Sequence, residues 1–295
     1  MNNSEELNGA QIVLEALKEQ EVDTIFGYPG GAVLPIYDAI FGQNFLKHVL
    51  VRAEAGAVHA AEGYARSSGQ VGVLLVTSGP GATNVVTGLT DALMDSIPIV
   101  CITGQVPSHL IGTDAFQECD TTGITRPCTK YNYLVKDVSK LSEVIHEAFE
   151  IARSGRPGPV LIDIPKNVQL AKSVYKPRKE ISFRPHRIKS GSTDISKEFI
   201  ENLISHVKKS TKPVLYVGGG CLNSGPKASE ELRKFAELTN IPVTTTLHGL
   251  GCYPGNGKLS IGMLGMHGTY EANLTMHDLS LIHISEPTRL LSISY

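Results

Sequence analysis

The chain has 295 residues, of which 41% are hydrophobic and 19% are charged, and its formal net charge is −2. This usage is typical of globular domains, and the length suggests about two of them with sizeable cores. No basic run favours nucleic acid or an anionic membrane, no apolar stretch predicts a membrane span, and five cysteines without a Cys-x-x-Cys pair predict reduced thiols in the cytoplasm.

Helical and strand patterns alternate along residues 1–171. The expected strands are short and apolar, which is typical of strands buried on both faces. Alternation of such strands with helices predicts an α/β fold built on a parallel sheet. In chain order, the expected elements are a helix around 10–17, a strand at 24–26, a helix at 33–41, a strand at 49–51, a helix at 54–66, a strand at 71–76, a helix at 83–94, a strand at 97–103, a helix at 141–153 and a strand at 160–164.

A second strand and helix series follows a segment of different composition. Residues 172–192 are rich in Lys, Arg, Pro and Ser and lack periodicity, which predicts an exposed interdomain linker. The second series predicts the opening of another α/β domain over 193–278, cut off before completion. Its expected elements are a helix around 199–207, a strand at 213–217, a helix at 232–238 and a strand at 241–245.

Glu54 is the most informative acidic residue, because it opens a segment made largely of Ala and Gly. Small residues let a flat ring or another backbone approach closely, and a shielded carboxylate there is costly without a partner. Thr77–Ala82 then spell a glycine-rich turn after an apolar strand. Loops after parallel strands carry function in such folds, so the acid, this turn and the loops 26–32 and 104–117 predict a cofactor site. A solvated Glu stabilised by the helix dipole is the alternative.

Five motifs in order resemble the N-terminal half of the large, catalytic subunit of acetolactate synthase (acetohydroxyacid synthase), and the resemblance runs from about 7 to 278. This family uses thiamine diphosphate in branched-chain amino-acid synthesis. The Gly-Thr-Asp-Ala-Phe-Gln-Glu run is the most specific, whereas the glycine-rich turn and the Glu are shared across thiamine-diphosphate enzymes. The motifs are Phe26–Ala32, the Glu54 segment, Thr77–Gly81, Gly112–Glu118 and Arg156–Pro165.

The resemblance implies that 1–171 form the pyrimidine-binding domain for thiamine diphosphate. Glu54 is then the residue that hydrogen-bonds the aminopyrimidine and favours its imino tautomer, although Ala53 and Ala55 replace the His and Gln that commonly flank it. Phe116 and Gln117 are implied to lie near the reactive carbon, whereas pattern alone favours a core-packed Phe and a solvated Gln. The implied cofactor or substrate loops, which are otherwise ordinary turns, contain Gly30, Gly31, Ala32, Gly79, Pro80 and Gly81.

Two further sets of residues match the family. Pro107, Ala115 and Lys166 correspond to the access channel in which herbicidal inhibitors bind, although a lone Lys is otherwise an ordinary surface charge. FAD in a structural role is implied on the middle domain. His59 and His248 lack metal-ligand spacing and are predicted to bind no metal, as is His267. The segments implied to line the flavin contain Arg156, Gly218, Gly219, Gly220, Thr245, Thr246, Leu247, Gly265, Met266, His267 and Gly268.

For the whole protein the resemblance implies condensation of pyruvate with pyruvate or 2-ketobutyrate, with loss of CO2, to 2-acetolactate or 2-aceto-2-hydroxybutyrate. The family binds the diphosphate and Mg²⁺ through a C-terminal domain with a Gly-Asp-Gly motif, which this sequence lacks, and builds each site across two subunits. We therefore expect a homo-oligomer (dimer or tetramer) of the full-length chain, a small regulatory subunit, no metal site in this chain, and an inactive fragment when the chain is alone.

Other interpretations remain open at this point. Another thiamine-diphosphate decarboxylase, carboligase or oxidase shares several motifs, and a non-catalytic flavin- or nucleotide-binding module explains the glycine triplet but not Glu54 with Phe116 and Gln117. From Leu279 the chain departs from the family and reads like a translated sequencing adapter, so 279–295 are interpreted as an artefact that packs irregularly. A natural divergent C-terminus is the alternative, which a buried strand continuing the sheet would favour.

Overall fold

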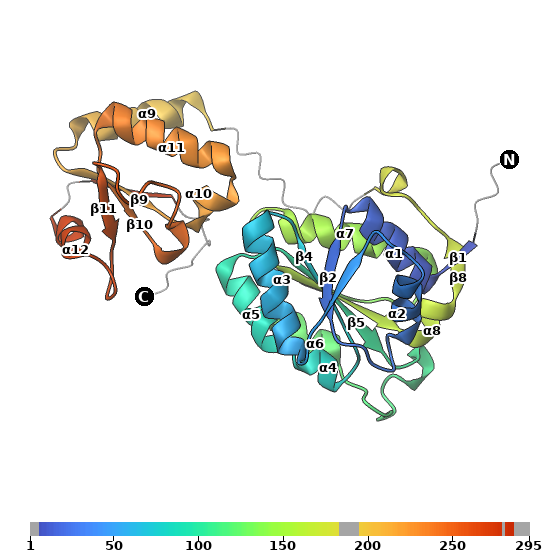
Figure 1. The fold of residues 1–295 in the computed structure, drawn as a ribbon. Helices are drawn as coiled ribbons and strands as arrows, with labels where there is room; N and C mark the ends of the chain where they lie inside the picture. The colour runs from blue at the N-terminus through green and yellow to red at the C-terminus, as the bar shows by residue number, and fades with distance from the viewer. Residues whose placement is uncertain (1–5, 183–194, 279–280, 286–295) are drawn as a thin grey trace. The chain divides into compact units, whose positions relative to one another are not determined.

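The computed structural model describes residues 6–182, 195–278 and 281–285 (Figure 1). It divides the chain into two compact units, Met1–Gly191 and Ser192–Tyr295. Each unit has its own parallel sheet and its own hydrophobic core. The α/β class that the sequence predicts is therefore confirmed for both units.

A six-stranded sheet of order β3-β2-β4-β5-β7-β6 forms the centre of the first unit, and every neighbouring pair is parallel. The central strands are buried along their whole length, which explains why they read as apolar runs. Of these six strands, only β6 was not predicted. It is half-buried at the sheet edge, so its Tyr-Asn-Tyr-Leu sequence lacks the apolar run that marks the central strands. The strands are β2 (Thr24–Gly27), β3 (Lys47–Leu50), β4 (Gly72–Val76), β5 (Ile99–Gln105), β6 (Tyr131–Leu134) and β7 (Pro159–Pro165).

Helices cover both faces of this sheet (Figure 1). Alternate strand residues divide between two cores: Val73 and Leu75 belong to one, while Leu74 and Val76 belong to the other. The first core is closed by α1 (Gly9–Glu19), α2 (Leu34–Phe41), α7 (Leu141–Arg153) and α8 (Lys166–Leu170), and the second by α3 (Glu54–Ser68) and α5 (Val86–Asp95).

The predicted linker begins too early. Its first residues form β8 (Lys172–Val174), which pairs antiparallel with β1 (Glu6–Asn8) in the first unit. Tyr175 then packs on the first core, and the Arg178 guanidinium bonds the Glu150 carboxylate of α7. A Lys- and Ser-rich composition concealed these contacts, because the segment lies on the surface yet is tied down by backbone pairing and single side chains. Residues 183–192 of the predicted linker lie outside the described part of the chain.

The second unit contains a parallel sheet of order β11-β10-β9-β12. Its core includes Leu215, Val217 and Val243 from the strands and Ala236 from a helix. Within the described residues, the helices are α9 (Lys197–Lys209), α10 (Gly219–Asn223), α11 (Pro226–Thr239) and α12 (Tyr270–His277), and the strands are β9 (Pro213–Val217), β10 (Val243–Thr245), β11 (Ser260–Met263) and β12 (Leu281–Ser285).

Strand β12 bears on the interpretation of 279–295. It pairs in parallel with β9, from Leu281 opposite Pro213 to Ser285 opposite Val217. The backbone of 281–285 is therefore regularly paired, while 279–280 and 286–295 lie outside the described part, and the expectation of irregular packing stays a prediction. A run rich in Leu and Ile has high strand propensity, and β9 offers it a free edge. Pairing of this kind follows from either origin of the segment, so the adapter interpretation stays a prediction.

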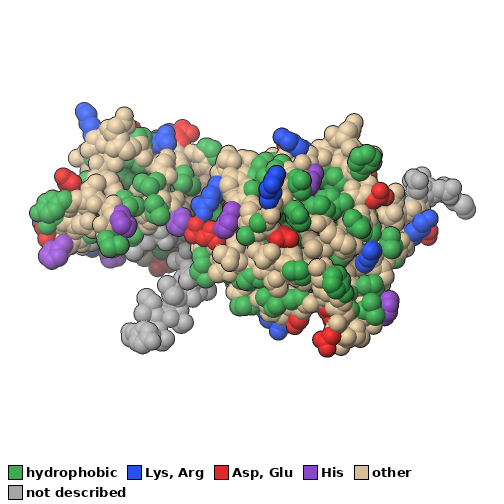
Figure 2. Space-filling view, turned by 60° about the horizontal axis from the view of Figure 1, so that its bottom comes forward, with side chains coloured by type: hydrophobic (Ala, Val, Ile, Leu, Met, Phe, Trp, Pro, Cys, Tyr) green, Lys and Arg blue, Asp and Glu red, His purple; other side chains and the backbone are tan. Residues whose placement is uncertain are grey.

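The surface agrees with the small net charge. On the face shown in Figure 2, Lys and Arg side chains lie among acidic and hydrophobic ones instead of forming a broad basic area. Among the described residues, none of the helices combines the length and the hydrophobicity that crossing a bilayer requires.

Candidate functional site

Loops that follow β2, β4 and β5 meet at the carboxyl edge of the first sheet. The bare Cα of Gly30 lies so close to Thr77 that an added Cβ would come within 3.0 Å of that side chain. Ala32 N donates to Thr77 Oγ1 (3.3 Å), and Ala32 O accepts from Gln169 Nε2 (2.7 Å). Gly31 has open space where a Cβ would stand. The structure thus brings together the loops that the sequence singled out.

Gly79 lies where two of these loops are in contact. Its φ is +52° and its ψ is −113°, a conformation that residues with a Cβ rarely adopt. A Cβ on Gly79 would also lie within 3.0 Å of the Gln117 carbonyl oxygen. Glycine is therefore required here for both reasons, and it places the turn after β4 directly against the loop that carries Gln117.

Glu54 lies beside the glycine-rich turn although it is distant in sequence. It is the first residue of α3, and its Oε2 accepts a hydrogen bond from Asn84 Nδ2 at 2.9 Å. Its Oε1 is 3.5 Å from the position that a Cβ on Gly81 would take. The side chain is half-buried, so the expectation of a carboxylate shielded from water is not met within this chain. The N-terminus of α3 lies at the surface of the unit, which explains the difference.

The loop Gly112–Glu118 is closed on itself by its last residue. The Glu118 carboxylate accepts from the backbone N–H of Gly112 and of Ala115, the latter at 3.0 Å, and these bonds lower the pKa of Glu118. Phe116 is 86% exposed, so it is not packed on the core as pattern alone favours. Gln117 is exposed as well and has a φ of +57°. The loop is thus fixed internally while it presents two side chains outward.

A buried polar network fixes the base of the same loop, and sequence reasoning missed it. Asp163 on β7 accepts from Thr103 Oγ1 (2.7 Å) and from Gln105 Nε2 (2.9 Å), and Gln105 Nε2 also donates to Cys119 O (2.8 Å). Burial raises the pKa of Asp163 to about 7. The sequence did contain a sign of this network, namely a Thr, a Gln and an Asp at inward positions of otherwise apolar strands. Because buried polar groups need hydrogen-bond partners, these three side chains could have been predicted to bond one another.

Two of the predicted channel residues lie in segments that are bonded to each other. Pro107 precedes a 3₁₀ turn whose Ser108 N donates to Asn167 Oδ1 at 2.8 Å. Asn167 is the neighbour of Lys166, which begins α8. Ala115 lies in the loop that Glu118 closes. All three channel residues are half-buried.

Most of the predicted flavin residues follow strands of the second sheet. Gly218 precedes α10 directly after β9, and the Thr246 side chain accepts from Gly249 N after β10. A Cβ on Gly249 would clash with Val217 O, so these two loops are in contact. Met266, which follows β11, is 91% exposed. The other residues of this set in the second unit are Gly219, Gly220, Thr245, Leu247, Gly265, His267 and Gly268.

Arg156 is the one member of this set that belongs to the first unit. Its guanidinium donates to Ser96 Oγ (2.7 Å) and to Leu93 O (2.9 Å), at the C-terminal end of α5. Cations in this position stabilise a helix by satisfying its last carbonyl groups. The structure therefore gives Arg156 a structural role, and its match to a flavin segment stays a prediction.

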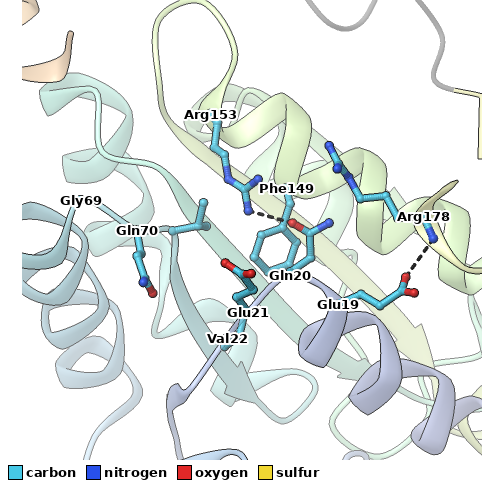
Figure 3. Close-up of a pocket in the computed structure, with 10 residues that line it drawn as sticks. Glu19, Gln20, Glu21, Val22, Gly69, Gln70, Phe149, Arg153 and Arg178 are labelled. Atoms are coloured by element: carbon cyan, nitrogen blue, oxygen red, sulfur yellow. Dashed lines mark hydrogen bonds between the residues drawn. The ribbon is translucent and has the colours of Figure 1, made fainter. Parts of the chain in front are cut away.

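A cavity of about 380 Å³ lies at the opposite, amino-terminal edge of the first sheet (Figure 3). Val22 and Val71, which precede β2 and β4, lie in its wall. Arg153 donates to Gln20 Oε1 at 2.7 Å. None of the site residues predicted from the sequence lines this cavity. Its lining is Glu19, Gln20, Glu21, Val22, Gly69, Gln70, Val71, Phe149, Arg153 and Arg178.

Comparisons with known proteins match each of the two units to a domain of one enzyme group. Residues 7–124 match the N-terminal TPP binding domain of thiamine pyrophosphate enzymes, and residues 200–283 match their central domain. The second match extends past 278, the limit that the sequence predicts for this domain. Thiamine pyrophosphate is the same compound as thiamine diphosphate.

Three relatives illustrate the similarity. The chain is 51% identical to the chloroplastic acetolactate synthase of Arabidopsis thaliana over 275 residues, which is 93% of this chain and 40% of that protein. It is 51% identical over 279 residues to an acetolactate synthase large subunit of Buchnera aphidicola, and 48% identical over 280 residues to the isozyme 3 large subunit of Escherichia coli; each alignment covers 94% of this chain and 48% of the relative. The chain thus spans less than half the length of these relatives.

Proposed function

Because the chain belongs to the thiamine pyrophosphate enzymes, as a homologue of acetolactate synthase large subunits, we propose that it supplies the pyrimidine-binding side of an acetolactate synthase active site. The reaction proposed for the whole protein is the condensation of pyruvate with pyruvate or 2-ketobutyrate, with loss of CO2. Thiamine diphosphate supplies the nucleophilic carbon and the electron sink of that reaction.

The observation that carries this proposal is the position of Glu54. Asn84 fixes one carboxylate oxygen, Oε2, at 2.9 Å. Among the described residues the other oxygen, Oε1, has no hydrogen-bond partner, and it faces Gly81, where the backbone carries no side chain. A flat ring fits beside a residue without a Cβ, and a carboxylate is the group that holds a proton at a ring nitrogen. Glu54 is therefore suited to the aminopyrimidine.

The remaining residues of the site position substrate and exclude water. Gly79 and the Asp163 network hold the loop that presents Gln117, whose amide is proposed to hydrogen-bond an oxygen of the bound ketoacid. Phe116 is proposed to cover the reacting atoms once a partner subunit completes the site, which accounts for its large exposure in the single chain. Pro107, Ala115 and Lys166 are proposed to line the approach of the substrate.

The other cofactors and partners are proposals of lower detail. FAD is assigned to the loops at the carboxyl edge of the second sheet, whose glycines let a phosphate approach the backbone. Mg²⁺ and the diphosphate group are assigned to sequence that this chain does not contain, since no Gly-Asp-Gly occurs in it. A homo-oligomer, a small regulatory subunit and a place in the cytoplasm complete the proposal.

Activity of the full-length protein tests the assignment. We expect acetolactate from pyruvate, detected as acetoin after acid treatment, and a loss of at least about 10²-fold for Glu54→Gln, which removes the proton-holding group. Glu198→Gln is the matched control, because Glu198 is also an acidic residue in the first turn of a helix but lies exposed in the second unit. It should keep full activity.

Two results would separate the alternatives, and two more would contradict parts of the proposal. Acetaldehyde or acetate as the main product would show another thiamine-diphosphate enzyme, and flavin without turnover would favour the binding module. Full activity of Glu54→Gln would contradict the role given to this residue. For the 295-residue chain alone we expect no acetolactate, and detectable product would refute that expectation.

A further inference from the structure

A second cluster of chemically active side chains lies on the two helices that cover one face of the first sheet. His59 and Glu62 are on α3, and Asp91 is on α5. His59 Nδ1 is 2.7 Å from Glu62 Oε2 and 3.9 Å from Asp91 Oδ2. One nitrogen and two carboxylate oxygens, one from each residue, all lie within 4.8 Å of one another.

Close packing of the helices makes this meeting possible. A Cβ on Gly88 would lie within 3.0 Å of the Val58 side chain, so α5 approaches α3 at a glycine. Leu89 and Ala92 of α5 share a fully buried core with Ala61 of α3. The three polar side chains are thus held by rigid, packed elements, and a site on such elements is geometrically defined before a ligand binds.

Glu62 points to a missing partner in this cluster. The residue is only 5% exposed, and its Oε1 is buried without a hydrogen-bond partner in the described part of the chain. Its other oxygen, Oε2, contacts the His59 imidazole at 2.7 Å, and Asp91 adds a second carboxylate nearby. A buried carboxylate oxygen without a partner is costly, and two carboxylates at this distance repel one another. A cation bound between them would relieve both costs.

We propose that His59, Glu62 and Asp91 form a binding site for a divalent transition-metal ion, with Zn²⁺ as the best fit. An imidazole nitrogen with two carboxylate oxygens is a donor set that Zn²⁺ accepts, and three protein ligands leave one tetrahedral position for water. His59 and Asp91 are half exposed on their side chains, so the ion has a path of entry. The site differs from the Mg²⁺ site of the proposed reaction, which needs residues that this chain lacks.

The site was not visible in the sequence. His59 and Glu62 share one face of a helix, which by itself is a common surface pair. Asp91 comes from another helix, and only the contact between α3 and α5 brings it to the other two. The sequence-based prediction that His59 binds no metal considered the spacing of histidines alone, and this proposal goes against it.

Occupation of the site would connect α5 to the helix that begins with Glu54. A ligand that binds the native state and not the unfolded chain stabilises the native state by mass action. We therefore expect Zn²⁺ to raise the unfolding temperature of the metal-free 295-residue chain. Co²⁺, which accepts the same ligands, should give visible d–d absorption of a low-symmetry site when it binds.

The decisive variants are Asp91→Asn and His59→Ala, which remove half-exposed side chains and leave the core intact. Each should weaken Zn²⁺ and Co²⁺ binding by at least about tenfold, since even the loss of an outer partner of a metal site costs 10- to 100-fold. His277→Ala is the matched control: His277 also contacts a carboxylate, that of Asp278, but belongs to no three-residue cluster among the described residues. It should leave binding unchanged.

Two outcomes would overturn the proposal. One is a wild-type chain whose unfolding temperature and Co²⁺ spectrum do not respond to either metal after treatment with a chelator. The other is a response that survives in both Asp91→Asn and His59→Ala, because the ion would then bind elsewhere. Loss of the response in both variants together with its retention in His277→Ala would support the site.

Discussion

Replacement of Gly79 by Ala tests the structural argument most directly. The residue has a φ of +52° with a ψ of −113°, and an added Cβ would lie within 3.0 Å of the Gln117 carbonyl oxygen. A residue with a Cβ held in such a sparsely populated backbone region costs about 1–3 kcal/mol. Forcing a methyl group into a filled position adds about 1–3 kcal/mol. We therefore expect Gly79→Ala to lower the free energy of unfolding by about 2–6 kcal/mol.

Gly63→Ala provides a matched control with the opposite sign. Gly63 lies inside α3, is exposed, and has open space where the Cβ would stand. Alanine in an exposed helix interior is favoured over glycine by about 0.5–1 kcal/mol, so this variant should be more stable than the wild type. Urea unfolding followed by circular dichroism is the assay, because the chain contains no tryptophan.

The difference in stability between Gly79→Ala and Gly63→Ala tests whether glycine is required at position 79. A Gly79→Ala variant within about 0.5 kcal/mol of the wild type, the usual range for uninvolved surface positions, would refute the requirement for glycine. So would equal effects of the two substitutions, since both add the same methyl group and only their backbone and surroundings differ.

Three further outcomes follow from burial and charge. His146 is fully buried, and burial lowers its pKa. Below about pH 6.5 the unfolded chain therefore binds a proton that the native state does not bind, so stability falls from pH 7 to pH 5. His146→Gln should reduce that fall in urea titrations. Asp163 has the opposite sign, because its pKa is raised to about 7. From about pH 4 to 7 the native state holds a proton that the unfolded chain has lost, so stability falls as the pH rises across this range and levels off above it. Asp163→Asn should flatten this fall in urea titrations. Phe116→Ala should change stability by less than about 0.5 kcal/mol at 86% exposure, whereas Phe149→Ala, fully buried, should cost about 3–5 kcal/mol by thermal unfolding.

The regular elements were predictable because burial on both faces leaves a strong pattern. The helix Leu141–Arg153 and the strand Pro213–Val217 have the bounds that the sequence predicts. The helix expected at 83–94 is in fact two, α4 (Pro80–Thr83) and α5, because the glycine-rich turn itself forms a short helix that ends at Thr83. Apolar periodicity continues through such a break and cannot reveal it.

Contacts between distant segments were predictable only where a family resemblance joined them. The motifs around Glu54 and Gly81 could be assigned to one site in this way, and the structure brings them together. Exposure was not predictable: Glu54 is half-buried and Phe116 is exposed, since exposure depends on how distant segments pack around a residue and not on its local sequence. The Asp163 network was also hidden, because its partners meet only through the register of β5 against β7.

The loop that presents Gln117 is held from two sides by other parts of the first unit. The Gln105 amide donates hydrogen bonds to Cys119 O, at the far end of the loop, and to Asp163 in the sheet. The Gln117 carbonyl packs against Gly79, where there is no side chain. Its own Glu118 closes the turn between them. Because these contacts exist within one chain, the proposed substrate-binding amide is positioned before any cofactor or partner subunit arrives. Preorganisation of this kind lowers the cost of binding, and it places the sensitivity of the site in the sheet and the turn beneath it.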